Sequence, residues 1–293
     1  MGVAAVWGST FLVVQDSTQR MPVLDFVAVR FAVGTLVLAM LRPRAVRSLD
    51  RAGWGRGAVL GVALGVSYTL QSFGLQHMSA TASAFVTGMF VVFTPLLSAL
   101  VLRRRVTLTT WAGTGLAVVG LALLTLRGLG LGIGELLTLG CALCISLQIL
   151  GTGAWATGQD PYGLAFAQMA TVSVIAVVVA APAGLNVVPP TPAAWFGVLW
   201  TGVLATAAAL VIQTWAQTRL SAARAVVIMT MEPVFAALFG LLAGQFLSVR
   251  RIIGCCLLLA AMVLVELHMQ GRTKAGSPPP NREQSPTPTG SSL

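Results

Sequence analysis

The chain has 293 residues, of which 56% are hydrophobic and only 9% are charged, and its formal net charge is +10. Roughly a quarter of the residues in soluble domains are charged, so this composition excludes a soluble globular protein and indicates an integral membrane protein. The basic residues lie between apolar runs, where positive charge orients membrane helices rather than binding a nucleic acid. The lipid bilayer is therefore the expected surrounding, and no nucleic-acid partner is expected.

Ten apolar runs follow one another along the chain, each long enough to cross a hydrocarbon core of roughly 30 Å as a helix. Segments rich in arginine, glycine or proline separate them and are expected to end the helices. The runs span about residues 2–18, 22–41, 57–76, 80–102, 108–126, 131–152, 161–183, 193–217, 222–245 and 249–268. From residue 269 the chain turns to Gly, Ser, Pro and Thr, which predicts a disordered cytoplasmic tail over 269–293.

The second half of the chain repeats the first. Gln71 and Gln213 begin two similar stretches that lie 142 positions apart. Further on, the first copy holds four more residues, about one helical turn, before Thr94-Pro95 aligns with Glu232-Pro233. Such self-similarity predicts two structural units built on one plan.

Five of the ten runs fall in residues 1–126 and five in residues 127–268. Because five is odd, the second unit enters the membrane the other way up, as in transporters built from inverted repeats. The expected fold class is an all-α integral membrane protein with ten transmembrane helices in two inverted five-helix repeats.

The distribution of Arg and Lys predicts the orientation, because cytoplasmic loops carry the excess of positive charge. With the N-terminus in the cytoplasm, thirteen basic residues fall inside and four outside. Those inside are Arg42, Arg44, Arg47, Arg51, Arg56, Arg103, Arg104, Arg105, Arg219, Arg224, Arg272, Lys274 and Arg282, and those outside are Arg20, Arg127, Arg250 and Arg251. Both termini are therefore expected in the cytoplasm.

Several motifs in this order resemble the EamA-type branch of the drug/metabolite transporter superfamily over residues 1–268. They are Trp7-Gly8-Ser9-Thr10-Phe11, Arg30-Phe31, the Ser-Ala turn before the run that reaches Thr94-Pro95, Gly134-Glu135, and Glu232-Pro233-Val234-Phe235-Ala236-Ala237. The resemblance implies a multi-pass carrier of the cell (inner) membrane that exports small metabolites through a pocket between its halves, with the fifth and tenth helices at the periphery. One departure is Arg103-Arg104-Arg105, where such chains commonly carry an acidic residue.

Polar side chains within membrane helices are expected to face protein or water, so their helical faces predict a substrate site. Thr206, Gln213 and Gln217 form one stripe, and Tyr68 and Gln71 share a face of the third run. Hydrogen bonding between helices is the alternative role for the glutamines. The residues expected to line the site are Trp7, Thr10, Phe11, Tyr68, Gln71, Gln148, Gln213, Trp215, Gln217 and Met229. Interfacial anchoring is the alternative for Trp7, and ordinary packing for Trp215 and Met229.

Glu232 is the strongest single candidate for a functional role, because an ionised carboxylate near the middle of the bilayer is energetically costly. A carboxyl that holds its proton in one state and loses it in another can couple proton movement to transport. Pro233 and its repeat mate Pro95 can bend their helices there, which suits a gate. Arg30, in the second run, is a candidate partner for a substrate charge, and the alternatives are snorkelling toward the outer surface or pairing with Glu232.

The four cysteines, Cys141, Cys144, Cys255 and Cys256, all lie inside apolar runs. A CxxC pair can bind zinc or carry out redox chemistry, yet Cys141 and Cys144 have no second ligand pair nearby. Small packing residues are the expectation, and neither a metal nor a cofactor is expected.

The function that these features favour is a secondary transporter that exports a small, amino-acid-like metabolite or a drug by alternating access, with proton exchange as the candidate driving force. The sequence has no GxxxxGK(S/T) motif for ATP. The alternatives are an intramembrane enzyme, for which HExxH and GxSxG motifs are lacking, and an uncoupled channel, which needs rings of like charge or a carbonyl filter. A small-molecule substrate is the expected partner, and both a monomer and a homodimer remain open.

Overall fold

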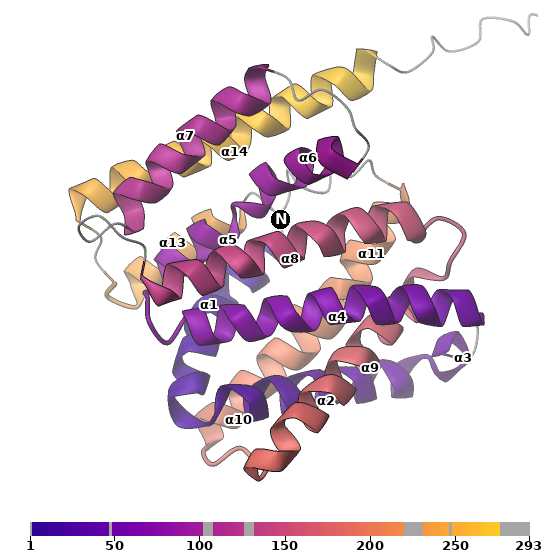
Figure 1. Cartoon of the computed structure of the whole chain (residues 1–293). Coiled ribbons are helices and arrows are strands. Elements are labelled where there is room, and N and C mark those ends of the chain that lie inside the picture. The colour runs from indigo at the N-terminus through magenta and orange to yellow at the C-terminus, as the bar shows by residue number, and fades with distance from the viewer. Residues whose placement is uncertain are drawn as a thin grey trace, which may run out of the picture.

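The computed structural model of the chain describes residues 2–46, 49–101, 108–125, 132–219, 231–245 and 248–275. Within these ranges the regular secondary structure is all helical, with no strand (Figure 1). Helices satisfy every backbone hydrogen bond within one segment, which apolar surroundings require.

The first half of the chain forms seven helical elements in the described residues. They are α1 (Gly2–Arg20), α2 (Val23–Leu41), α3 (Pro43–Val46), α4 (Arg51–Gly74), α5 (Ala80–Thr87), α6 (Phe90–Val101) and α7 (Leu108–Thr125). Two differ from the expected runs. The helix of the third run begins earlier, at Arg51, because the Asp50 carboxylate caps it by accepting a 2.7 Å hydrogen bond from Gly53 N–H. The fourth run is two helices rather than one.

The break in the fourth run lies at Gly88 and Met89, ahead of Pro95, which is inside α6. Here the chain passes close to the other half of the molecule. A Cβ added to Gly88 would meet Met262 Cε and would lie 3.2 Å from Pro233 Cγ. The break is thus a point where two halves of the chain meet closely.

The second half forms eight helical elements in the described residues. Its elements are α8 (Ile133–Trp155), α9 (Pro161–Ala180), the 3-10 turn η1 (Ala181–Ala183), α10 (Pro192–Leu199), the π-helical segment η2 (Trp200–Ala208), α11 (Ala209–Arg219), α13 (Glu232–Leu242) and α14 (Val249–Ala275). The eighth run is one continuous path through α10, η2 and α11. The last helix continues to Ala275, so the segment expected as tail begins as helix, and residues 276–293 lie outside the described part.

Six helical segments of the described chain are long and apolar enough to cross a membrane. They are Val23–Leu41, Arg51–Gly74, Ala80–Leu100, Ile133–Trp155, Pro161–Ala183 and Pro192–Thr218. Shorter apolar helices, Trp111–Leu123, Glu232–Leu242 and Ile252–Leu264, fall in three further expected runs. The helix of the first run, α1, is not among these segments.

Helix contacts recur in a regular pattern between the halves. Helix α2 packs on α9, and α7 packs on α14. Helix α4 of the first half packs on α8, and α1 packs on α10 and η2 of the second half. Likewise, α1 packs on α13, and α8 packs on α5 and α6. Figure 1 shows α7 and α14 side by side at one edge of the bundle, with α2 and α10 at the opposite edge.

A small residue allows close packing of α4 against α9. A Cβ added to Gly61 of α4 would lie 2.7 Å from the Gln168 carbonyl oxygen and 2.7 Å from Thr171 Cβ, both on α9. Close backbone approach increases dispersion contact where no water is available to drive helices together. The α4–α9 contact therefore depends on the missing side chain at Gly61.

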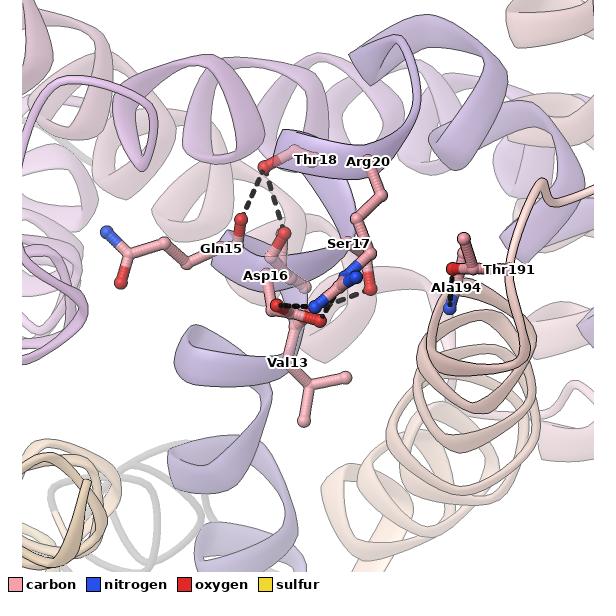
Figure 2. Close-up of polar contacts among 9 residues, drawn as sticks. Val13, Gln15, Asp16, Ser17, Thr18, Arg20, Thr191 and Ala194 are labelled. Atoms are coloured by element: carbon pink, nitrogen blue, oxygen red, sulfur yellow. Dashed lines mark hydrogen bonds and ion pairs between the residues drawn. The ribbon is translucent and has the colours of Figure 1, made fainter.

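The end of α1 shows how polar side chains are satisfied at one surface (Figure 2). Arg20 forms an exposed ion pair with Asp16 one turn earlier, at 2.8 Å between Nη2 and Oδ1. Thr18 donates to the Val14 and Gln15 carbonyl oxygens. Nearby, the Thr191 hydroxyl accepts from Ala194 N–H at 3.2 Å and caps α10, which packs against α1. Asp16 therefore belongs to a helix end and not to the bundle interior.

Candidate functional site

A cavity lies between the two halves of the described chain. Its volume is about 50 Å³. Trp7, Thr10, Leu64, Ser67, Tyr68, Gln71 and Phe90 line it from the first half, and Cys141, Ile145, Gln148, Gln213 and Glu232 line it from the second. The space suits a few water molecules, so a larger solute requires the walls to move apart.

Seven of the residues expected at the site line this cavity: Trp7, Thr10, Tyr68, Gln71, Gln148, Gln213 and Glu232. Five lining residues were missed. Leu64 and Ser67 precede Gln71 by seven and four positions on α4, and Cys141 and Ile145 precede Gln148 by seven and three positions on α8. These spacings keep a residue on one helical face, so extending the faces of Gln71 and Gln148 by two turns finds all four. Phe90 has no comparable signal.

Helix α1 is tied to the other half at the cavity wall. The indole N–H of Trp7 donates a 2.7 Å hydrogen bond to the Ala205 carbonyl oxygen in η2, and Trp7 is 8% exposed. The neighbouring Gly8 allows α13 to approach, because an added Cβ would lie 2.6 Å from Phe235 Cβ and 2.8 Å from Ala236 N. The Trp7-Gly8 pair thus positions one wall of the cavity between η2 and α13.

An amide network forms a second wall. Gln148 Nε2 donates to Gln168 Oε1 at 2.8 Å and to Thr152 Oγ1 at 3.1 Å. Gln213 Nε2 in turn donates to Gln148 Oε1 at 3.4 Å. Gln168 is fully buried on α9 and does not line the cavity. Gln168 holds the Gln148 amide in one orientation, and Gln213 donates to the amide oxygen of Gln148.

Gln71 and Phe90 line the wall contributed by α4 and the start of α6. Gln71 Nε2 lies 3.4 Å from Thr87 Oγ1, its acceptor on α5. The Phe90 carbonyl oxygen accepts a hydrogen bond from Ser146 of α8 at 3.2 Å. The break between α5 and α6 is therefore fastened to α8 directly beside the cavity.

Glu232 is the one carboxyl group among the lining residues. It is the first residue of α13 and is 8% exposed. In the described part of the chain no Arg, Lys or His lies within ion-pair distance of it. A buried carboxylate without a basic partner is costly in apolar surroundings, so the group can exchange a proton or a cationic ligand through the cavity.

Arg30 lies behind the cavity rather than in it. The guanidinium carbon stands 4.5 Å from the centre of the Tyr68 ring, and Nε donates to Thr206 Oγ1 at 2.9 Å. Arg30 is 1% exposed, and its Nη2 has no hydrogen-bond partner in the described residues. Tyr68 therefore separates a buried cation from the cavity that it lines.

The remaining candidates lie elsewhere. Phe11 is 2% exposed within a core cluster around α2 and α9, and Gln217 donates to the Ile149 carbonyl oxygen at 3.3 Å. Trp215 is 47% exposed and lines a different hollow. Pro233 follows Glu232 in the first turn of α13, where a proline lacks no helical hydrogen bond. Met229 lies outside the described residues.

The described residues offer few groups that could bind a metal ion. Among the described residues no three His, Cys, Asp or Glu side chains come together as a metal site. Cys141 lines the cavity and Cys144 is partly buried, and both are free thiols. The lining is instead a mixture of amides, hydroxyls, aromatic rings and aliphatic groups with one carboxyl, which suits noncovalent recognition of a small amphipathic solute.

Comparisons with known proteins agree with this arrangement. The EamA-like transporter family matches the chain twice, over residues 1–126 and 132–267. An uncharacterized transporter from Archaeoglobus fulgidus is 31% identical over 271 residues, which cover 91% of this chain and 84% of that protein. A crystal structure at 18% identity superposes with a TM-score of 0.68 and covers 92% of this chain and 96% of its own, so the fold is shared.

Proposed function

Because the chain belongs to the EamA-like transporter family and is a multi-pass membrane protein, we propose that it exports a small metabolite through the central cavity by alternating access. The observation that carries the proposal is the cavity itself: its polar groups come from both halves of the chain. Two halves that rock about a shared site can expose that site to one side of the membrane at a time.

An inverted repeat of ten transmembrane helices is part of the proposal. The recurring contacts support it. Exchanging α1 with α8, α4 with the α10–η2–α11 path, and α5–α6 with α13 turns the α4–α8 contact into the α1–α10 and α1–η2 contacts, and the α1–α13 contact into the α8–α5 and α8–α6 contacts. The α2–α9 and α7–α14 contacts map onto themselves. Pairing of this kind is what a pseudo-two-fold axis between the halves predicts. The proposed location is the cell (inner) membrane with both termini in the cytoplasm, and the excess of arginine in the loops expected inside supports it.

The lining predicts the kind of solute. Gln71, Gln148 and Gln213 offer amide donors and acceptors, while Trp7, Tyr68 and Phe90 offer aromatic faces. Together they suit a small amphipathic, amino-acid-like metabolite or drug with an apolar part and a hydrogen-bonding part. Transport occurs without chemical change, so the protein is not an enzyme.

Proton coupling through Glu232 completes the mechanism. The carboxyl lies at the cavity between α1 and α8, and no basic side chain neutralises it in the described residues. A proton and a cationic group of the substrate compete for this one carboxylate, so the entry of a proton from outside releases the substrate there. Such competition is the exchange that drives export against a gradient.

The test is efflux from proteoliposomes loaded with labelled amino acids, nucleosides and small organic acids under an imposed pH gradient. The wild-type protein is expected to release at least one solute saturably, and faster when the outside is more acidic. Glu232→Gln is expected to lose the acceleration by the pH gradient. Glu135→Gln, which changes a carboxyl at the start of α8 outside the cavity, serves as the matched control and keeps it.

Two outcomes contradict the proposal. Release of a solute only in chemically altered form favours an intramembrane enzyme. Flux that rises linearly with solute concentration and does not saturate favours an uncoupled channel.

A further inference from the structure

A second hollow lies outside the central cavity, at the arginine-rich end of the bundle. We call it the interfacial slot, and its walls include Arg42, Asp160, Tyr162, Val211, Ile212 and Trp215. Its volume is about 220 Å³, against about 50 Å³ for the central cavity. These residues come from the end of α2, the start of α9 and the middle of α11.

The slot has a charged mouth and an apolar wall. Arg42 directly follows α2 and Asp160 directly precedes α9, so both lie where the chain leaves the apolar bundle. Val211 and Ile212 lie one turn before Trp215 on α11, and Ile212 and Trp215 are each 47% exposed. Tryptophan at this level is typical of the boundary between membrane and water.

Arg42 is held in place at the mouth. Its guanidinium carbon lies 5.2 Å from the centre of the Tyr162 ring. Tyr162 is itself fixed, because its hydroxyl donates a 2.7 Å hydrogen bond to the Leu38 carbonyl oxygen of α2. Arg42 makes no ion pair with any residue that the structure describes. The result is a preorganised cation with its donor groups available to an incoming anion.

The positive charge continues beyond the slot. Arg44 is exposed on α3, the short helix that packs against α9, and Arg51 begins α4. The opposing charge at the mouth is Asp160, whose carboxylate accepts Tyr162 N–H at 3.3 Å and so faces the start of its own helix. The mouth thus combines a basic rim with one carboxylate that is engaged as a helix cap.

We propose that the interfacial slot binds an anionic phospholipid, with the headgroup phosphate on the Arg42 guanidinium and an acyl chain along Val211, Ile212 and Trp215. Arginine binds phosphate through paired hydrogen bonds, and basic pockets between helices on the cytoplasmic side bind anionic headgroups. The apolar wall distinguishes this ligand from a free phosphate, which gains nothing from an aliphatic surface. A lipid in the slot contacts α2 of the first half and α9 and α11 of the second.

The experiment is native mass spectrometry of the full chain in detergent, titrated with phosphatidylglycerol or with phosphatidylcholine of the same acyl chains. The wild-type protein is expected to bind phosphatidylglycerol with the higher affinity. Arg42→Gln is expected to lower that affinity about fivefold, the effect of one basic residue near an anionic lipid surface. Arg44→Gln, which removes an arginine outside the slot, is the matched control and is expected to change it less than twofold.

Asp160→Asn gives a change of the opposite sign. Asparagine caps helices as well as aspartate, so the fold is kept while the negative charge leaves the mouth, and the affinity for phosphatidylglycerol is expected to rise. Equal binding of the two lipids, equal effects of Arg42→Gln and Arg44→Gln, or displacement of the bound lipid by inorganic phosphate at similar concentration overturns the proposal.

Discussion

The indole nitrogen of Trp7 lies 2.7 Å from the carbonyl oxygen of Ala205, and this hydrogen bond ties the first helix of one half to the π-helical segment of the other. Both residues are buried, Trp7 at 8% and Ala205 at 1% exposure. A second bond runs alongside, from Trp200 Nε1 to Ser9 Oγ at 3.0 Å. Two side chains, Trp7 from the first half and Trp200 from the second, therefore join α1 to η2 at one wall of the cavity.

Replacing Trp7 by phenylalanine tests this link. The aromatic ring stays, but the buried Ala205 carbonyl loses its donor, which is expected to lower the free energy of unfolding by about 1–3 kcal/mol. Trp195→Phe is the control, because Trp195 is 42% exposed on α10. Thermal unfolding in detergent measures both variants. A Trp7→Phe protein that unfolds at the wild-type temperature contradicts a structural role for the bond.

Gln168→Leu tests the amide network behind the cavity. Gln148 keeps its bond to Thr152 but loses the acceptor on α9, so its amide is less firmly oriented. Loss of one such bond is worth about 0.5–1.5 kcal/mol, and KM for the exported solute is expected to rise about two- to tenfold with little change in maximal rate. Gln159→Leu, an amide in the turn before α9, is expected to leave KM unchanged. An unchanged KM in Gln168→Leu removes Gln168 from the site.

The helices could be predicted largely from sequence, because a membrane span is a signal of composition and length. Each of the ten expected runs contains a helix where the structure describes it. The break at Gly88 was not predicted, because the apolar run continues through it without a proline or a polar segment, and its neighbours Pro233 and Met262 are far away in sequence. The early start at Arg51 follows from capping by Asp50, a local signal that hydropathy alone overlooks.

The roles of the candidate site residues stay predictions, but their placement follows helical faces: Gln71 and Gln148 line the cavity, whereas Trp215, chosen by residue type alone, does not. Trp215 is two positions from Gln213, so it lies about 200° around the same helix. If Gln213 faces the cavity, Trp215 faces away, as the structure has it. Gln168 could not be found by this means, because it supports the site through Gln148 without lining the cavity.

Arg30→Lys tests what the buried guanidinium does behind Tyr68. Lysine keeps the charge but lacks the planar group that stacks on Tyr68 and donates through Nε to Thr206, and arginine and lysine are not interchangeable at stacked sites. Transport is expected to fall at least tenfold in Arg30→Lys, and no more than threefold in Arg44→Lys, which changes an exposed arginine. Efflux from proteoliposomes measures both. Full activity in Arg30→Lys means that the charge alone is sufficient.

Gly61→Ile addresses the α4–α9 contact on which two walls of the cavity depend, since α4 carries Tyr68 and Gln71 and α9 carries Gln168. A side chain at Gly61 meets the Gln168 carbonyl oxygen and Thr171 Cβ, each 2.7 Å from the ideal Cβ position. Because one of these atoms is backbone, the helices must separate. Overpacking of this kind lowers the free energy of unfolding by about 1–3 kcal/mol.

The control for Gly61 is another helical glycine. Gly153 of α8 has open space around its Cβ position, and alanine is favoured over glycine inside a helix by about 1 kcal/mol, so Gly153→Ala is expected to raise the unfolding temperature while Gly61→Ile lowers it. The same separation of α4 from α9 displaces Gln168 from Gln148, so Gly61→Ile is also expected to raise KM as Gln168→Leu does. If Gly61→Ile loses stability but keeps its KM, the α4–α9 contact supports the bundle without setting the geometry of the cavity.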